Sequence, residues 1–167
     1  FNEVSQWCAA LILAQRIPEA RAAVWQRLIA VAEWLQRLNN FNSLMAMLAA
    51  FNTSAVYRLH ATRELLPAQA RAWYDAAMRL MNADGSYRNY REALRTARTP
   101  LLPYLGVYLT DLTFIEDGNR DMVGPLINFR KRQLVYSIIA DIQLYQQASY
   151  LIVPNRDLLA LLHTLPA

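Results

Sequence analysis

Cysteine, glycine and histidine are scarce in this chain of 167 residues. The single cysteine, Cys8, excludes an internal disulfide and is typical of proteins from a reducing compartment. The four glycines form no phosphate-binding loop. His60 and His163 lie far apart and have no metal-ligand spacing with the cysteine, so we expect no metal site and no cofactor. These absences also argue against covalent catalysis.

Long hydrophobic runs are absent as well. No apolar run reaches the roughly 18–20 residues that a helix needs to cross a bilayer, and no signal peptide is visible. We therefore expect a cytoplasmic protein. The net charge is +4, but the seventeen basic residues are scattered, and their longest cluster is only Arg130-Lys131-Arg132. A nucleic-acid-binding protein concentrates such residues along one element, so we expect no nucleic-acid partner.

The residues that are abundant favour helices. Hydrophobic residues make up 55% of the chain and recur at helical spacing, and no strand alternation or internal repeat appears. The sequence therefore predicts an all-α fold of roughly eight helices in one domain, residues 1–167. The expected helices cover about residues 3–16, 18–38, 41–51, 67–81, 87–95, 103–119, 126–145 and 154–162.

Caps and turn residues predict where these helices begin and end. Ser86 is expected to cap the helix over 87–95. Pro103 suits the first turn of the following helix, and Gly118 suits a left-handed position just after its end. Residues 103–145 then form two long helices with a short turn between them, which predicts a helical hairpin.

The helix over 103–119 carries a narrow polar stripe. Gly106, Thr110, Thr113 and Asp117 are spaced i, i+4, i+7 and i+11, which places them within roughly 60° of arc on one face. The remaining faces are apolar, and such a helix is normally packed on several sides. One interpretation is a central core helix whose small residues let a neighbour approach closely. The other is an exposed surface that leads to an acid.

The charges at the tip of this hairpin are also unusual. Glu116 and Asp117 lie at the C-terminal end of one helix, and residues 130–132 lie near the N-terminal end of the next. Both placements oppose the helix dipole, at about 0.3–1 kcal/mol for each exposed charge. Mutual pairing, for example of the aspartate with Arg130 or Arg132, is one explanation. Presentation of the acid to a partner is the other.

Several stretches that follow one another along the chain resemble those of a known family. They are LNNFNSLMAMLAAFNTSAVYRL (38–59), YRNYREALR (87–95), PYLGVYLTDLTFIEDGN (103–119), LINFRKR (126–132) and IQLYQQASY (142–150). Together they resemble the catalytic domain of Ras-family guanine-nucleotide exchange factors. FNEVSQW (1–7) is similar to a segment part-way into that domain, so the chain would hold about its C-terminal two-thirds, without its N-terminal helices.

The resemblance implies an all-helical fold whose hairpin, residues 103–145, protrudes and inserts into a small GTPase beside the nucleotide. A pocket on the domain body would hold switch 2 of that GTPase. Such a protein catalyses nucleotide dissociation without making or breaking a bond. The implied partner is a Ras-like GTPase of Ras or Rap type, and contact with membranes would come only through the lipidated GTPase.

The resemblance also implies which residues act. Thr113 and Asp117 match the catalytic wedge positions, where well-known members have an aliphatic residue and a glutamate. These differences leave open an alternative function, a helical scaffold that binds a small GTPase without exchange. The expected GTPase-binding residues are Met45, Asn52, Tyr87, Tyr104, Thr110, Asn119, Leu134 and Tyr145. Without the resemblance, Met45 and Tyr104 could be core residues, and Asn52 could be only a helix cap.

Overall fold

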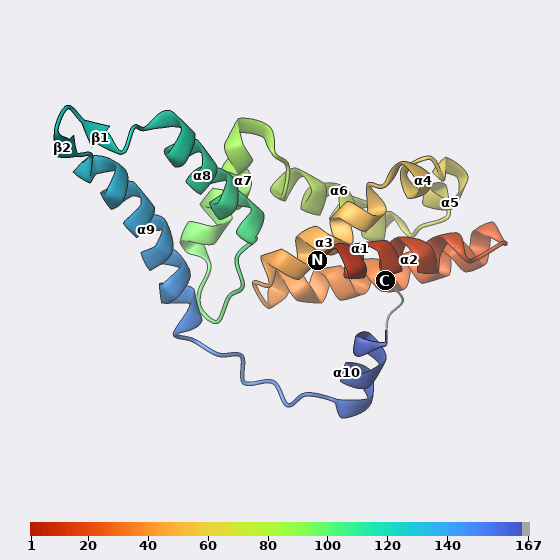
Figure 1. The fold of residues 1–167 in the computed structure, drawn as a ribbon. Coiled ribbons are helices and arrows are strands. Elements are labelled where there is room, and N and C mark those ends of the chain that lie inside the picture. The colour runs from red at the N-terminus through yellow and green to blue at the C-terminus, as the bar shows by residue number, and fades with distance from the viewer. Residues whose placement is uncertain (165–167) are drawn as a thin grey trace.

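A computed structural model describes residues 1–164 of the chain. Within these residues the chain forms ten helices and one two-stranded sheet, and Figure 1 shows their arrangement. The all-α prediction is therefore confirmed, although two helices are single short turns that the sequence did not indicate. The elements are α1 (Asn2–Leu13), α2 (Pro18–Arg37), α3 (Phe41–Phe51), α4 (Ser54–Tyr57), α5 (His60–Glu64), α6 (Ala68–Leu80), α7 (Asp84–Thr96), α8 (Leu105–Gly118), β1 (Met122–Val123), β2 (Leu126–Ile127), α9 (Phe129–Gln146) and α10 (Arg156–His163).

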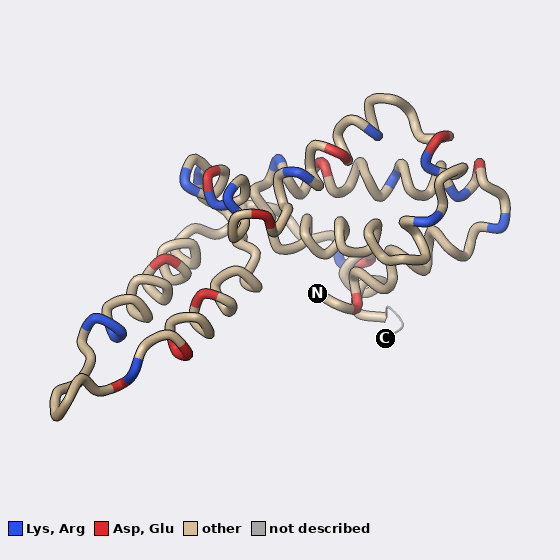
Figure 2. Tube along the Cα trace, turned by 90° about the horizontal axis from the view of Figure 1, so that it is seen from above, with Lys and Arg blue, Asp and Glu red and all other residues tan. Residues whose placement is uncertain are grey.

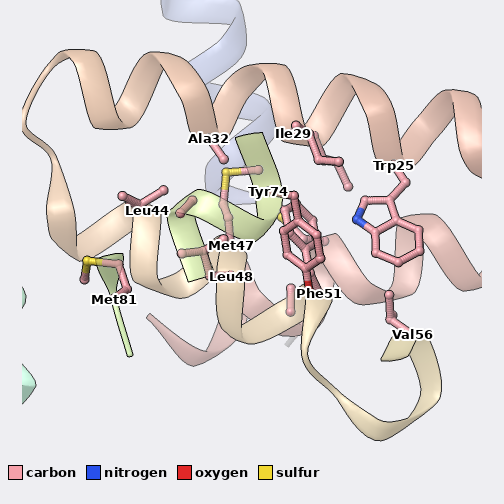
Figure 3. Packing of buried hydrophobic residues seen from close by; sticks show 14 of the residues in the cluster. Trp25, Ile29, Ala32, Leu44, Met47, Leu48, Phe51, Val56, Tyr74 and Met81 are labelled. Carbon is pink, nitrogen blue, oxygen red and sulfur yellow. The ribbon is translucent and has the colours of Figure 1, made fainter. Parts of the chain in front are cut away.

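A helical body forms around α3, which packs against α1 and α2. The α3 sequence is apolar on nearly all sides, and Asn40 caps it by accepting a hydrogen bond from the Ser43 amide. Three buried aromatic rings from α2, α3 and α6 meet beside it (Figure 3). Trp25 lies 6.1 Å from Phe51 and 6.2 Å from Tyr74, measured between ring centroids. This cluster fixes the body from which the rest of the molecule extends.

Helices α8 and α9 leave the body as an antiparallel pair (Figures 1 and 2). The small hairpin of β1 and β2 closes the far end of the pair, with Met122 opposite Ile127 and Val123 opposite Leu126. Because few residues of α8 touch the body, only Val107 and Tyr108 of that helix are buried. The interpretation of residues 103–119 as a central core helix is therefore wrong.

The two ends of the hairpin are tied to the same turn of the body, between α2 and α3. At the start of the hairpin, the amide of Leu102 donates to the Asn39 carbonyl, and the Phe41 amide donates back to the Leu102 carbonyl. After α9, the Tyr150 hydroxyl donates to the Leu38 carbonyl at 2.7 Å. These contacts set the direction in which the hairpin leaves the body.

Two of the expected boundaries of α8 are wrong. Pro103 precedes the helix rather than lying in its first turn, because the backbone of Tyr104 is extended and its amide donates to the Tyr90 hydroxyl. Gly118 is the last residue of α8 and has no left-handed conformation. The Asn119 side chain takes over the cap by donating to the Ile115 carbonyl at 2.9 Å.

The expected starts of α7 and α9 are wrong as well. Helix α7 begins before Ser86, and residues 85–87 have positive φ, so the serine lies in a kink rather than at a cap. Helix α9 begins at Phe129 rather than Leu126, because the Asn128 side chain caps it and the preceding residues pair in the sheet. The expectation of no strands is corrected by this sheet, which is two residues long on each side.

Candidate functional site

The polar stripe of α8 lies on the surface of the hairpin. Thr110, Thr113 and Asp117 are exposed and Gly106 is half-buried. The Thr110 hydroxyl donates to the Gly106 carbonyl at 2.8 Å, and the Thr113 hydroxyl donates to the Leu109 carbonyl at 3.0 Å. The helix itself thus satisfies both hydroxyl donors. The stripe therefore presents the small methyl groups of the two threonines, with an acid at its end.

Asp117 makes no hydrogen bond or ion pair through its side chain within residues 1–164, although it lies at the end of α8 that the dipole makes negative. The expected pairing at the tip does occur, but it uses the neighbouring acid. Glu116 forms an ion pair with Lys131 at 2.8 Å. The expected pairing of Asp117 with Arg130 or Arg132 is not seen among the described residues.

Lys131 anchors the tip of the hairpin from within. This side chain is only 2% exposed, and its ammonium group lies 2.8 Å from Glu116 and 3.0 Å from Asp121. Arg132 adds a second ion pair to Asp121 at 2.8 Å. Hydrogen bonding to Glu116 raises the pKa of Lys131, and hydrogen bonding to Lys131 lowers the pKa of Asp121. The network joins the end of α8, the loop and the start of α9.

A second feature is a groove on the body beside the hairpin. Its volume is about 450 Å³, and it lies where α3, the end of α6 and the start of α7 meet. Three of the expected binding residues, Met45, Asn52 and Tyr87, line this groove together. The complete lining is Met45, Leu48, Ala49, Asn52, Met78, Arg79, Met81, Asn82, Ala83 and Tyr87.

The groove is apolar with a polar edge. Met45 packs against the core but is only half-buried, so part of its side chain faces the groove. The Asn52 side chain is exposed and makes no hydrogen bond within the described residues. Asn52 is the C-cap residue of α3 through its backbone, as the cap interpretation expects, but its side chain caps neither α3 nor α4 and is left at the edge of the groove. A concave surface of this kind, with thioethers and aromatic rings, suits an apolar side chain from a partner.

Tyr104 connects the groove to the hairpin. Its ring lies 6.0 Å from that of Tyr87 and also contacts Phe1. On its other side, a Cβ atom at position 106 would collide with the Tyr104 ring, so Gly106 is the residue that lets this ring cover the start of α8. Groove, tyrosine pair and stripe therefore form one continuous surface.

Three tyrosines around this junction, Tyr90, Tyr104 and Tyr108, have a raised pKa. Burial raises the pKa of Tyr104, and it raises the pKa of Tyr90 to about 12. The Tyr90 hydroxyl accepts a hydrogen bond from the Tyr104 amide. Tyr145 on α9 lies beside Tyr108 of α8. Burial raises the pKa of Tyr108 most, and a hydrogen bond with Tyr145 is the second cause. These neutral phenols contribute packing and hydrogen bonds rather than charge.

The structure divides the expected residues into three groups. Met45, Asn52, Tyr87 and Tyr104 meet at the groove, and Thr110, Thr113 and Asp117 share the stripe. The others lie elsewhere on the hairpin: Asn119 caps α8, Leu134 is partly exposed on α9, and Tyr145 packs toward α8.

Sequence reasoning missed several parts of the site. Met78 and Met81 of the groove come from the end of α6 and carry no motif that could have marked them. The burial of Lys131 was also unexpected, because nothing in residues 130–132 of the sequence indicates it.

The remaining reactive side chains lie away from this surface. Cys8 is buried in the body, and burial raises the pKa of its thiol to about 11, which keeps it protonated near neutral pH. In the part of the chain that the structure describes, no group of three potential metal ligands is found, and no helix is long and apolar enough to cross a membrane.

An apolar groove beside a protruding helical hairpin defines a protein-docking module of the helical class. The comparisons with known proteins name the family: residues 1–133 match the RasGEF domain, and the chain belongs to this family.

Its relatives include Ras guanine nucleotide exchange factors of Dictyostelium discoideum. Factor J is 44% identical over 163 residues, which are 97% of this chain and 20% of the relative. Factor A is 45% identical over 161 residues, 92% of this chain and 26% of the relative. Factor K is 43% identical over 151 residues, 90% of this chain and 10% of the relative. The chain thus spans at most about a quarter of these proteins.

Proposed function

We propose that the chain promotes GDP release from a Ras-like small GTPase. The observation that supports this function best is the continuous surface from the groove, through Tyr87 and Tyr104, to the α8 stripe. An exchange factor must hold one part of the GTPase while it displaces another, and such a surface offers both a pocket and a projecting wedge. Membership of the RasGEF family supports the same function.

In this mechanism the groove holds an apolar side chain of switch 2. The hairpin enters beside the nucleotide with Thr113 and Asp117 foremost. The carboxylate of Asp117 lies unpaired at the end of the stripe, so it can repel the phosphates and compete for the groups that bind them. No bond forms or breaks, and catalysis is the preferential stabilisation of the nucleotide-free GTPase.

Two further assignments belong to the proposal. The partner is of Ras or Rap type, and the chain is about the C-terminal two-thirds of the family domain, with residues 103–145 as its hairpin. The protein would meet a membrane only through its lipidated partner.

A release assay tests the proposal. Ras, Rap, Ral and Rho proteins loaded with a fluorescent GDP analogue would be mixed with the protein, and the loss of fluorescence would be followed after addition of excess GTP. We expect accelerated release from a Ras or Rap protein. Tight binding to a nucleotide-free GTPase without accelerated release would instead support the scaffold alternative, in which the shorter acid and the polar Thr113 make the wedge ineffective.

A further inference from the structure

Helix α7 carries a row of arginines that the scattered charge of the sequence did not reveal. Arg88, Arg91 and Arg95 are spaced i, i+3 and i+7, so they share one face of the helix. The other face of α7 packs on the body through Tyr90, which is fully buried. Figure 2 shows a dense group of basic positions where the body meets the hairpin.

This row lines a cleft between α7 and α8 with a volume of about 240 Å³. The middle arginine is already committed. Arg91 donates to the Ser86 carbonyl and to the carboxylate of Asp111 on α8, both at 2.8 Å. The outer two, Arg88 and Arg95, are exposed, and within residues 1–164 neither makes an ion pair or a side-chain hydrogen bond.

Arg88 lies beside the kink at the start of α7. Its guanidinium group lies against Gly85, and a Cβ atom at position 85 would come within 3.1 Å of it. Since Gly85 also has a φ of +59°, this position favours glycine for its backbone as well.

The cleft borders the proposed GTPase-binding surface on two sides. Tyr87, which lines the groove, precedes Arg88 in the chain, and Asp111 follows Thr110 of the stripe on α8. A partner that fills the groove and covers the stripe therefore also comes close to the two uncommitted arginines.

We propose that Arg88 and Arg95 form an electrostatic docking site for an acidic patch on the GTPase, an inference that rests on the proposed function. Guanidinium groups pair with carboxylates through two parallel hydrogen bonds, and such pairs steer association. A membrane fits the cleft less well. The site is concave, whereas an anionic lipid surface is broad.

Charge reversal with a matched control tests this site. The variant Arg88→Glu/Arg95→Glu is compared with Arg27→Glu/Arg58→Glu, which makes the same change in net charge at exposed arginines that line neither the groove nor the cleft and make no ion pair within residues 1–164. The probe is the GTPase that responds best to the wild-type protein. We expect the first variant to lower kcat/KM for GDP release about tenfold at low salt, mainly through slower association, with the difference shrinking at high salt. The control should change it less than about twofold.

The outcomes separate the two proposals. No release by the wild-type protein would refute the proposed function, whereas normal release by Arg88→Glu/Arg95→Glu would refute only the docking site. Equal losses in both variants would also refute it, since net charge alone would then explain the effect. Circular dichroism melts check folding, and Arg88→Gln/Arg95→Gln provides a milder variant. Flotation with phosphatidylserine vesicles is the last arm. Binding that depends on these arginines while release in solution is unchanged would assign the cleft to membranes and overturn the proposal.

Discussion

Thr113 and Asp117 lie one turn apart on α8, and only the threonine side chain hydrogen-bonds to the helix. The threonine hydroxyl bonds to the Leu109 carbonyl, while the carboxylate has no partner in the described part of the chain and lies where the dipole disfavours it. A fold that needed only stability would gain from a neutral residue at position 117. The two residues therefore differ in what a substitution should reveal.

Thr113→Arg tests the wedge. The side chain is exposed, so the larger residue should leave the melting temperature nearly unchanged. It should lower the rate of GDP release at least tenfold, a loss of roughly 1.4 kcal/mol of transition-state stabilisation. Gln133→Arg, at an exposed position on α9, adds the same charge as a control. Release rates equal to the control would exclude Thr113 from the site.

Asp117→Asn separates a functional acid from a structural one. Because the acid opposes the dipole and forms no ion pair with any described residue, the change should keep or raise the melting temperature, by a few tenths of a kcal/mol in the free energy of unfolding. GDP release should slow if the carboxylate acts on the phosphate site. Both quantities are measured on one preparation. A protein that melts earlier and still exchanges at the wild-type rate would make Asp117 structural.

At the scale of elements, the buried ammonium of Lys131 determines how α8 and α9 meet. The pKa of Asp121 is lowered from its ordinary value of 3.8, so its contribution to stability is present above that value and is lost as pH falls through the lowered pKa. The pKa of Lys131 is raised from 10.5, so its contribution is present below that value and is lost as pH rises through the raised pKa. The tip should be most stable between these two values.

Lys131→Met should release Asp121 from this network. Methionine has a similar volume and no charge, so the carboxylate should titrate closer to its ordinary value of 3.8. The measurement is the side-chain carboxyl carbon shift of Asp121 in an NMR titration. Arg132→Gln is the control and should have a smaller effect, because Lys131 is the main cause of the lowered pKa. An unchanged titration in Lys131→Met would mean that the ammonium does not hold the tip in solution.

Tyr104 joins the two elements of the proposed site. Its ring contacts Tyr87 at the groove and covers Gly106 on the hairpin. Tyr104→Ala should weaken binding to the nucleotide-free GTPase by about 2 kcal/mol or more, mostly through faster dissociation. Surface plasmon resonance measures both rates, and Tyr136→Ala on α9, an exposed tyrosine, is the comparison. Affinity at the wild-type level would place Tyr104 outside the binding surface.

At the scale of the whole molecule, the body supplies the stability and the hairpin supplies exposed surface. Phe51 is fully buried between Trp25 and Tyr74, whereas Phe114 on the hairpin is 69% exposed. Phe51→Ala should lower the free energy of unfolding by about 3–5 kcal/mol. Phe114→Ala, the same change on the surface, should alter it by no more than about 0.5 kcal/mol. Urea denaturation compares them, and a similar cost for both would mean that α8 is packed in solution.

The sequence by itself determined the helical class and most of the helices of the body. Residues 41–51 were predicted as a helix with the bounds that α3 has, because the spacing of their apolar residues is a local signal. Spacing alone also placed Thr110, Thr113 and Asp117 on one face. Family motifs in order along the chain indicated the exchange-factor resemblance.

Only the tertiary structure decided which of these surfaces are exposed. Helix α8 is apolar enough for a core, and periodicity cannot show that it leaves the body. Its direction is set by hydrogen bonds of Leu102 and Tyr150 to residues 38–41, which are distant in sequence. The groove likewise needs α3, α6 and α7 to meet, and the arginines of α7 line a cleft only because α8 places Asp111 against Arg91. Burial and charge pairing depend on contacts between elements, and a local sequence pattern does not show which element will lie against it.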